Sequence, residues 1–363
     1  MSGVRHLYVH LPFCAHRCGY CDFVTLVGRR GDHAKYVDAL LSELELEREL
    51  LDEPLATVFL GGGTPTFTEP RDLARLLRAL PEAAEVTVEA NPETVTPALA
   101  ALLREAGVTR VSLGVQSFEP RLLAVLERRA RPENVRRAFY HLRDVSFDNI
   151  SLDLIYGIPG QTAADLRSDL EQALALGPEH LSCYELEAKP GTRFTHEHGA
   201  ELERQAEAME GYFELVVETL VGAGYRWYET ANFCREGRQA QHNLAYWHGR
   251  DYLGLGIGAV STVGNTRWRN TPKLRDYVAA LSAGEAPRRE IEALDEAVKR
   301  RERLMLGLRL DEPVALAAVG DALDAAALRR LQAFGLAERR SGGVVLTERG
   351  RFLGGGVTAE LVT

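Results

Sequence analysis

Short apolar runs and amphipathic segments alternate along the first half of the chain, and this alternation constrains the fold more than any other feature. The apolar runs typical of strands cover residues 7–10, 57–60, 85–89, 110–114, 149–155 and 180–186. Helical patterns cover residues 32–51, 70–80, 97–106, 122–126, 133–142 and 163–176. Such alternation gives a parallel sheet with right-handed crossovers. Six strand–helix units, fewer than the eight of a closed barrel, predict a partial barrel that is open on one side.

Three cysteines stand in one short loop directly after the first predicted strand. Cys14, Cys18 and Cys21 form a C-x3-C-x2-C run, so all three thiols can point at one centre. Three thiolates on a four-iron cluster leave one iron with an open position, where a small molecule can bind and react. Thiols without a metal remain an alternative, as does a zinc site. The fourth ligand that zinc needs could come from His10, His16 or His33.

The composition limits the class of protein. Apolar residues make up 45% of the 363 residues, which suits one large domain and a small one with a sizeable core. The formal net charge of -9 argues against nucleic acid as a main partner, because phosphate binding relies on clustered Lys and Arg. The sequence has no basic–apolar leader and no long apolar run, so we expect neither a signal peptide nor a membrane-spanning helix.

The two remaining cysteines, Cys183 and Cys234, lie far from the loop and from each other. Both are expected to be buried as small hydrophobic side chains. Bare thiols and an oxidisable cluster together indicate a reducing, cytoplasmic location.

Glycines and polar residues follow several of the predicted strands. The triplet 61–63 comes directly after the strand over residues 57–60, where backbone without Cβ atoms can approach a ligand closely. An ordinary tight turn is the alternative. Polar residues at or just after later strand ends can face the same mouth of the barrel, although each taken alone is also explained as a solvated or capping residue. These residues are Glu89, Gln116, Arg128 and Asp153.

A third pattern is the run His242-Asn243-Leu244-Ala245-Tyr246-Trp247. On a helix, His242 and Tyr246 share one face, and Asn243 and Trp247 share another. Histidine is a common axial ligand of heme iron, and aromatic neighbours can pack on a porphyrin. Ordinary packing of a histidine beside aromatic side chains is the alternative.

The pattern changes towards the carboxyl end. Two helical patterns, over residues 298–310 and 324–334, precede two short strands, 335–339 and 344–346, around a Ser-Gly-Gly turn. This order predicts a compact winged-helix-like module. No exposed basic cluster stands out, so a docking or covering role is expected rather than DNA binding. The predicted parts are a barrel with the cysteine loop (1–230), a bridging region with the His242 run (231–294) and the winged-helix-like module (295–363).

The cysteine run and its flanks resemble a known family. Cys14-x3-Cys18-x2-Cys21, with Tyr20 before the last cysteine, is similar to the signature of the radical S-adenosylmethionine (radical SAM) superfamily. The flanking words, residues 8–13 (YVHLPF) and 20–23 (YCDF), resemble the coproporphyrinogen III oxidase-like branch and, within it, the heme chaperones. The resemblance covers nearly the whole chain, from Tyr8 to the segment at residues 346–347.

The resemblance implies a fold, cofactors and partners. The fold would be a (β/α)6 partial TIM-like barrel, and the three cysteines would hold a [4Fe–4S] cluster. S-adenosylmethionine would be contacted by Tyr8, Tyr20, Gly62, Gly63, Thr64, Glu89, Gln116, Arg128 and Asp153. An H-N-x-x-Y-W motif proposed for heme binding matches His242, Tyr246 and Trp247. The implied function is to bind heme and deliver it to acceptor hemoproteins, among them membrane-associated respiratory enzymes.

The sequence departs from its relatives at two places. Ala130 stands where relatives often carry a histidine after a Leu-x-Arg segment, and Val260 stands where many have the histidine of Gly-Ala-His-Ser. Both changes remove a potential porphyrin or iron contact, which leaves His242 as the single histidine candidate.

Two other functions remain open. An oxygen-independent coproporphyrinogen III oxidase decarboxylates two propionates to give protoporphyrinogen IX. That enzyme has a further cysteine two residues after the third ligand, where this chain has Phe23, and several dozen residues ahead of its cluster, where this chain has thirteen before Cys14. Both differences favour the chaperone. A binding module with a purely structural cluster is the second alternative, against which the complete set of cofactor residues argues.

The spacing of the cysteines generates a first prediction. Cys→Ala at position 14, 18 or 21 should abolish the iron–sulfur absorbance of the anaerobically purified protein, because each thiolate holds its own iron. The matched changes at positions 183 and 234 should leave the absorbance and the iron content intact. Four iron atoms retained per chain in Cys18→Ala would contradict the assignment.

Overall fold

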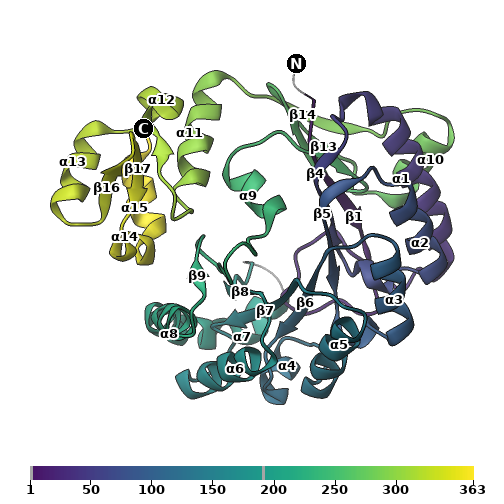
Figure 1. Ribbon diagram of the computed structural model, residues 1–363, viewed down its shortest axis with the longest axis horizontal. Coiled ribbons are helices and arrows are strands. Elements are labelled where there is room, and N and C mark those ends of the chain that lie inside the picture. Colours follow the sequence, from purple (N-terminus) through teal and green to yellow (C-terminus); the bar gives the residue numbers. More distant parts are fainter. Residues whose placement is uncertain (1–2, 190–192) are drawn as a thin grey trace.

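The computed structural model describes residues 3–189 and 193–363, and a single large sheet forms its centre. Within these ranges the sheet has nine strands in the order β11-β1-β4-β5-β6-β7-β8-β10-β9 (Figure 1). Six of them are neighbours in parallel register: β1 (His6–Leu11), β4 (Leu55–Gly62), β5 (Ala83–Ala90), β6 (Arg110–Gln116), β7 (Ile150–Tyr156) and β8 (His180–Glu185). The strand order does not close on itself, which confirms the partial barrel.

Three further strands extend the two edges of this sheet. β11 (Leu253–Leu255) pairs in parallel with β1, and β10 (Asn232–Cys234) pairs antiparallel with both β8 and β9 (Arg226–Trp227). Sequence patterns did not predict these short strands, because runs of two or three residues carry no readable periodicity.

Helices cover the outer face of the curved sheet (Figure 1). They are α1 (His33–Glu47), α2 (Pro70–Ala79), α3 (Pro97–Glu105), α4 (Pro120–Val125), α5 (Pro132–Asp144) and α6 (Ala163–Leu176). All six match predicted helices. The predicted helix over residues 32–51 is too long, since α1 ends at Glu47 and a 3₁₀ turn, Arg48–Leu50, follows. Two helices directly after these were not predicted, α7 (Arg193–Gln205) and α8 (Met209–Gly222), and neither were the later helices over residues 274–282, 316–319, 348–352 and 354–361.

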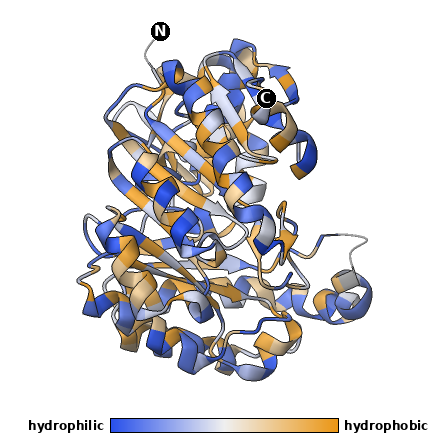
Figure 2. Cartoon of the chain, turned by 90° about the vertical axis from the view of Figure 1, so that its right-hand side faces the viewer, coloured by the Kyte–Doolittle hydropathy of each residue, from blue (hydrophilic) through white to orange (hydrophobic). Residues whose placement is uncertain are grey.

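The strands bury one face against these helices and turn the other inward. On β6, Val111, Leu113 and Val115 lie in the apolar core, while the alternate residues of the strand line the barrel interior. Figure 2 shows the corresponding hydrophilic and hydrophobic banding along the elements. Successive side chains of a strand point to opposite faces, so the inner face is free to carry polar chemistry.

The bridging part of the chain forms a second, smaller sheet. Its strands are antiparallel: β12 (Val260–Val263), β13 (Thr266–Asn270) and β14 (Arg289–Ala293). Two helices accompany it, α9 (Gln241–Trp247), which carries the His242 run, and α10 (Leu274–Ser282), which packs on α1.

The carboxyl-terminal part has an apolar cluster of its own, drawn from residues 304–361. It contains α11 (Glu296–Gly307), α12 (Leu316–Val319), α13 (Ala325–Ala333), α14 (Glu348–Phe352), α15 (Gly354–Leu361) and a sheet of β15 (Val314–Ala315), β16 (Ala337–Arg340) and β17 (Gly343–Leu346). Asp295 and Asp324 cap α11 and α13 by accepting backbone N–H bonds. The helix–helix–hairpin order agrees with the winged-helix-like prediction, while the boundaries at residues 230 and 294 stay predictions.

A buried carboxylate ties the bridging part to the barrel. Glu43 of α1 is 1% exposed and accepts hydrogen bonds from the Tyr277 hydroxyl at 2.5 Å, the Asn270 amide at 2.6 Å and the Gly256 N–H at 2.8 Å. The Arg289 guanidinium lies 3.8 Å away. These donors come from α10, β13, β14 and the loop after β11, so one side chain holds four segments together.

Removing this carboxylate should destabilise the protein strongly. Glu43→Ala removes the acceptor of three buried donors and a charge beside Arg289, which keeps its 2.5 Å hydrogen bond to Glu47, at a cost of about 3–5 kcal/mol in the free energy of unfolding. The matched control is Glu45→Ala on the same helix, since Glu45 is 75% exposed and forms a surface ion pair with Arg48. That change should cost less than about 1 kcal/mol. Equal urea midpoints for the two variants would show that Glu43 does not hold these segments.

Candidate cofactor site

A cavity of about 600 Å³ opens at the carboxyl ends of β4 to β8, and the predicted cofactor residues gather there. All three loop cysteines line it. So do all but one of the predicted cofactor residues, namely Tyr20, Gly62, Gly63, Thr64, Glu89, Gln116, Arg128 and Asp153. Tyr8 does not line the cavity, and its hydroxyl lies 3.1 Å from His10 Nδ1.

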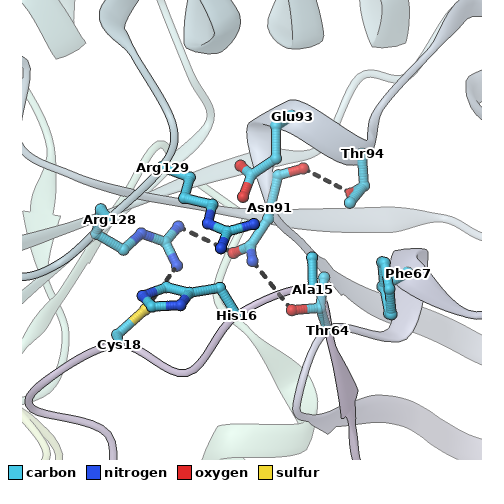
Figure 3. A pocket seen from close by; sticks show the side chains of 10 residues that line it. All are labelled: Ala15, His16, Cys18, Thr64, Phe67, Asn91, Glu93, Thr94, Arg128 and Arg129. Carbon is cyan, nitrogen blue, oxygen red and sulfur yellow. Dashed lines mark hydrogen bonds between the residues drawn. The ribbon is translucent and has the colours of Figure 1, made fainter. Parts of the chain in front are cut away.

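An arc of hydrogen bonds joins Cys18 to Cys14 across the cavity wall, and Figure 3 shows the part of it from Cys18 to Thr64. The Arg128 guanidinium donates to Cys18 Sγ at 3.6 Å and to Asn91 Oδ1 at 2.9 Å. Asn91 in turn donates to Thr64 Oγ1 at 3.0 Å, and Thr64 Oγ1 lies 3.5 Å from Cys14 Sγ. This cysteine arc fixes the rim of the loop without a disulfide, since all five cysteines are free.

The protonation of the thiols fits a site that receives a cation. Burial raises the pKa of Cys14 to about 11, against the opposing effect of its Thr64 hydrogen bond, and burial also raises the pKa of Cys21. Metal binding requires the thiolate, so a positive centre beside these sulfurs would offset the cost of their burial.

No group of three His, Cys, Asp or Glu side chains in the described part of the chain is arranged to hold a single metal ion. This requirement differs from that of a multi-iron cluster, in which each thiolate binds a different iron and the sulfurs need not meet at one atom. Two of the histidines considered for zinc have other partners: His10 Nε2 lies 2.8 Å from the Val24 carbonyl oxygen, and His33 Nδ1 accepts from the Glu69 N–H at 3.1 Å.

The last two glycines of the triplet line the cavity and also pack closely against the segment just before the cysteine loop. A Cβ on Gly62, whose φ is +110°, would lie 2.4 Å from the His10 ring, and one on Gly63 would lie 2.6 Å from the Pro12 carbonyl. Close packing beneath the cysteine loop therefore requires both glycines. The sequence pattern indicated a close approach but did not identify the cysteine loop as the neighbour.

Two half-buried carboxyl groups, Glu89 and Asp153, line the cavity. Burial, then the nearby Asp153, raises the pKa of Glu89 to about 7, and burial raises the pKa of Asp153. Asp153 accepts from the Ser112 hydroxyl at 3.0 Å, and Glu89 accepts from the Gly62 N–H at 3.1 Å. The Arg110 guanidinium opposes both shifts and is itself 2% exposed. This part of the cavity is thus a set of acceptors held in place by fixed donors.

Gln116 and Arg128 line the cavity because of backbone features that could not be predicted from the sequence. Gln116 ends β6 with φ +68° at an irregular register, a conformation that turns its side chain away from regular alternation. The prediction that Arg128 follows a strand is wrong: it lies after α4. Its guanidinium nevertheless donates to the Gly114 carbonyl on β6 at 2.6 Å, which brings it to the strand ends.

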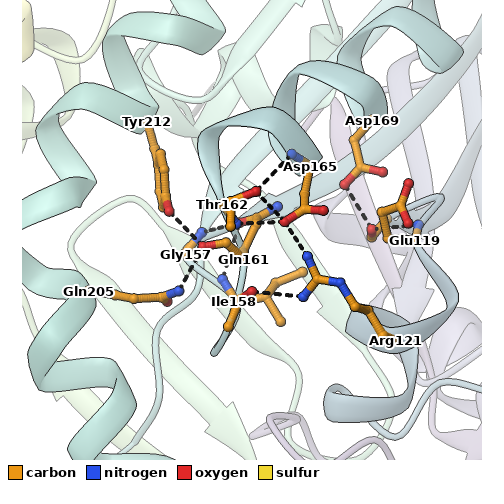
Figure 4. Close-up of polar contacts among 12 residues, drawn as sticks. Glu119, Arg121, Gly157, Ile158, Gln161, Thr162, Asp165, Asp169, Gln205 and Tyr212 are labelled. Atoms are coloured by element: carbon orange, nitrogen blue, oxygen red, sulfur yellow. Dashed lines mark hydrogen bonds and ion pairs between the residues drawn. The ribbon is translucent and has the colours of Figure 1, made fainter.

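The loop after β7 is held by two helices that the sequence analysis missed (Figure 4). The Gln161 side-chain oxygen accepts from the Gly157 N–H at 2.8 Å. Its backbone carbonyl accepts from Tyr212 of α8 at 2.7 Å and from Gln205 of α7 at 3.1 Å. These bonds fix the chain directly after the strand that carries Asp153.

The heme candidates lie apart from this cavity. His242 is 1% exposed, and its ring nitrogens are both engaged: Nδ1 lies 2.7 Å from Thr57 Oγ1, and Nε2 lies 2.9 Å from the Tyr246 hydroxyl. Burial lowers the pKa of His242 to about 3. The predicted shared face of His242 and Tyr246 is therefore present, but iron ligation would require one of these bonds to break. Tyr246 and Trp247 line a second cavity.

Several cavity residues escaped the sequence analysis. Asn91 completes the cysteine arc, Ser112 orients Asp153, and Asn243 of α9 reaches the first cavity. A signal existed for Ser112 and for Arg110, since both are polar residues at alternate positions of an otherwise apolar strand. Asn91 stands two residues after Glu89, and the sequence analysis assigned it no role.

Comparison with known proteins identifies the chain. Residues 8–173 match the model of the radical SAM superfamily, and residues 294–353 match the HemN C-terminal domain. Fold and cavity thus define a radical SAM protein, a class that implies S-adenosylmethionine and a [4Fe–4S] cluster. The chain is 38% identical over 370 residues to the heme chaperone HemW of Mycobacterium tuberculosis, covering 98% of this chain and 94% of that protein. The chain belongs to the HemW family.

Other relatives agree with this placement. The heme chaperone HemW of Bacillus subtilis is 33% identical over 369 residues, with 97% of each chain covered. Among solved structures, the coproporphyrinogen III oxidase HemN of Escherichia coli superposes with a TM-score of 0.82 over 100% of this chain and 91% of that chain. Its sequence identity is 23%, so this likeness shows the fold. In the described part of this chain, no helix has the length and apolar character needed to span a membrane.

The raised pKa of Glu89 predicts a pH dependence of stability. In the unfolded chain the pKa of this carboxyl lies near its ordinary value of 4.5, whereas in the folded protein burial raises it to about 7. The folded state therefore binds more protons between these values, and stability falls as the pH rises through them. Glu89→Gln removes this loss, so its stability relative to the wild type should grow by about 1–3 kcal/mol from pH 5 to pH 8.

Thermal unfolding of the metal-free protein at the two pH values provides the measurement. The matched control is Glu133→Gln, because Glu133 is exposed on α5 and does not line the cavity. Its stability difference from the wild type should be the same at pH 5 and pH 8. If the stability difference between Glu89→Gln and the wild type were the same at pH 5 and pH 8, the raised pKa of Glu89 would be contradicted.

Proposed function

We propose that this protein is a heme chaperone, which binds heme and delivers it to acceptor hemoproteins with the help of a [4Fe–4S] cluster and S-adenosylmethionine. The observation that carries the proposal is the similarity to heme chaperones over nearly the whole chain, 38% identical across 98% of its length. The structure supports the proposal because three thiols and a set of polar side chains line one cavity.

In this proposal Cys14, Cys18 and Cys21 hold the cluster. When bound, the cluster supplies an electron-transfer centre with one iron position open to a small molecule. The Arg128 guanidinium donates to Cys18 Sγ, and the Thr64 hydroxyl lies beside Cys14 Sγ. Both groups therefore stabilise negative charge on these two sulfurs.

The same proposal assigns S-adenosylmethionine to the cavity beside the cysteine loop. Glu89 and Asp153 offer acceptors for amino or ribose groups, and the Arg128 guanidinium suits a carboxylate. Since Ser112 and the Gly62 N–H already hold the two carboxyl groups, little side-chain freedom is lost when a ligand binds. The barrel would orient and shield the cofactor, whose chemistry is its own.

A coproporphyrinogen oxidase is the competing function, because the fold is shared with HemN. Phe23 stands where the oxidase resemblance places a further cysteine, and its side chain is 65% exposed at the edge of the cavity. Oxidative decarboxylation needs a propionate carbon held beside the reactive centre with water kept out. An exposed aromatic side chain at the rim does not supply such an enclosure, which favours the chaperone.

One experiment separates the two functions. The anaerobically reconstituted protein should bind heme in an absorbance titration. With reductant and S-adenosylmethionine, it should convert coproporphyrinogen III no faster than its Cys18→Ala variant, since that variant lacks a cluster ligand. Formation of protoporphyrinogen IX above the rate of Cys18→Ala would overturn the chaperone assignment in favour of the oxidase.

A further inference from the structure

A second cavity, of about 800 Å³, is lined by the last residues of α9, whereas Asn243, nearer the start of the helix, lines the cofactor cavity. It is bounded by α9, by β12 and β13, and by α11 of the carboxyl-terminal part. Aromatic side chains form part of its wall, with Tyr246 and Tyr252 in edge-to-face contact at 4.6 Å between ring centroids. Trp247 and Met305 also line it, and Met305 is 49% exposed. Its size and partly apolar lining suit a small-molecule ligand with a flat, extended surface.

Two cations in this second cavity have no acidic partner. Neither Arg250 nor Arg303 makes an ion pair or a side-chain hydrogen bond within residues 3–189 and 193–363, and Arg303 Nη1 is buried with no acceptor. Burial, then the charge of Arg250, lowers the pKa of Arg303. Arg250 is exposed and Arg303 is half-buried, so the cost of burying the unpaired Arg303 charge falls when an anion joins the two guanidinium groups.

The acidic residues of the same wall do not supply that anion. Glu302 pairs with Arg267 at 2.6 Å, Glu296 lies 3.7 Å from Lys299, and Asp251 accepts from the Gly264 N–H at 2.8 Å. A further donor, Trp247 Nε1, is also buried without an acceptor. The cavity thus offers unmet N–H donors and excess positive charge beside aromatic surface, a combination that matches an aromatic ligand bearing carboxylates.

A histidine with uncommitted ring nitrogens stands in the same wall. The His248 side chain makes no hydrogen bond in the described ranges, and its nearest charged partner is Glu312, whose carboxylate lies 4.0 Å from Nε2. Burial and the charges of Arg303 and Arg250 lower the pKa of His248, so its ring is neutral at physiological pH. A neutral imidazole is the form that binds iron. His242, in contrast, has both nitrogens engaged.

Resting on the proposed function, we infer that heme binds in this second cavity, with His248 as the iron ligand and Arg250 and Arg303 as partners of its two propionates. Trp247, which follows the His-Asn-x-x-Tyr segment directly, then supplies aromatic surface and a donor. The role of His242 is to fix α9 to β4 through Thr57, and so to position the helix that carries His248.

The test uses two probes on the full-length protein, heme and metal-free protoporphyrin IX, which share propionates and differ in iron. His248→Ala should change the Soret band and weaken heme about tenfold or more, while leaving protoporphyrin affinity nearly unchanged. Arg250→Gln/Arg303→Gln should weaken both probes by roughly ten- to a hundredfold, since charged hydrogen bonds are lost. His242→Gln should keep the wild-type Soret band, because glutamine can still hydrogen-bond to Thr57 and Tyr246.

Matched controls are His196→Ala on α7 and Arg301→Gln on α11, two exposed positions that do not line the second cavity. Both should bind heme as the wild type does. If His248→Ala binds heme with the spectrum and affinity of the wild type, His248 is not the iron ligand. If the double arginine variant binds both probes as the wild type does, the second cavity is not the heme site. Failure of the wild type itself to bind heme would instead refute the proposed function.

Discussion

The architecture depends on one constraint: every central strand must bury an apolar face under the outer helices. Val111, Leu113 and Val115 meet that requirement on β6, so the alternate positions of this strand point into the barrel. A side chain there lies outside the core under the helices, so polar or charged residues can occupy it without loss of core packing. Arg110 and Ser112 do so, and the neighbouring strands add Glu89 and Asp153. The cavity chemistry thus follows from the same period of two that builds the core.

Much of the fold could be predicted from the sequence because this period is strong. The six central strands and the helices between them match the predicted segments. The predictions failed where periodicity ends: β9 to β11 have two or three residues each, and α7 and α8 follow a stretch without a clear pattern. The loop after β7 depends on those two helices, since Tyr212 and Gln205 hold the Gln161 carbonyl. Contacts of this kind join residues far apart in the chain, and local patterns carry no signal for them.

Most cofactor residues could be predicted from motif spacing and family resemblance, whereas their hydrogen-bond partners could be identified only in the structure. Cys14 and Cys18 were evident, but the arc through Arg128, Asn91 and Thr64 was not, because it joins a helix end, a turn and a strand end. The His242 motif shows the opposite difficulty. Residue type and helical spacing suggested a ligand, whereas hydrogen bonds to Thr57 and Tyr246 occupy both ring nitrogens. Sequence spacing places a side chain on a face but does not reveal whether its atoms are free.

Helix α9 stands between the two cavities, and its residues divide between them. Asn243 lines the cofactor cavity, while Tyr246, Trp247 and the following His248 line the second cavity. In the proposed arrangement, heme and S-adenosylmethionine therefore bind in two separate cavities that share the residues of one short helix. A ligand outside the barrel is not presented to the reactive centre inside it, which suits a cargo that must leave chemically unchanged. The same helix is fixed to β4 through His242 and Thr57, so a shift of the strand on binding in one cavity would move residues that line the other.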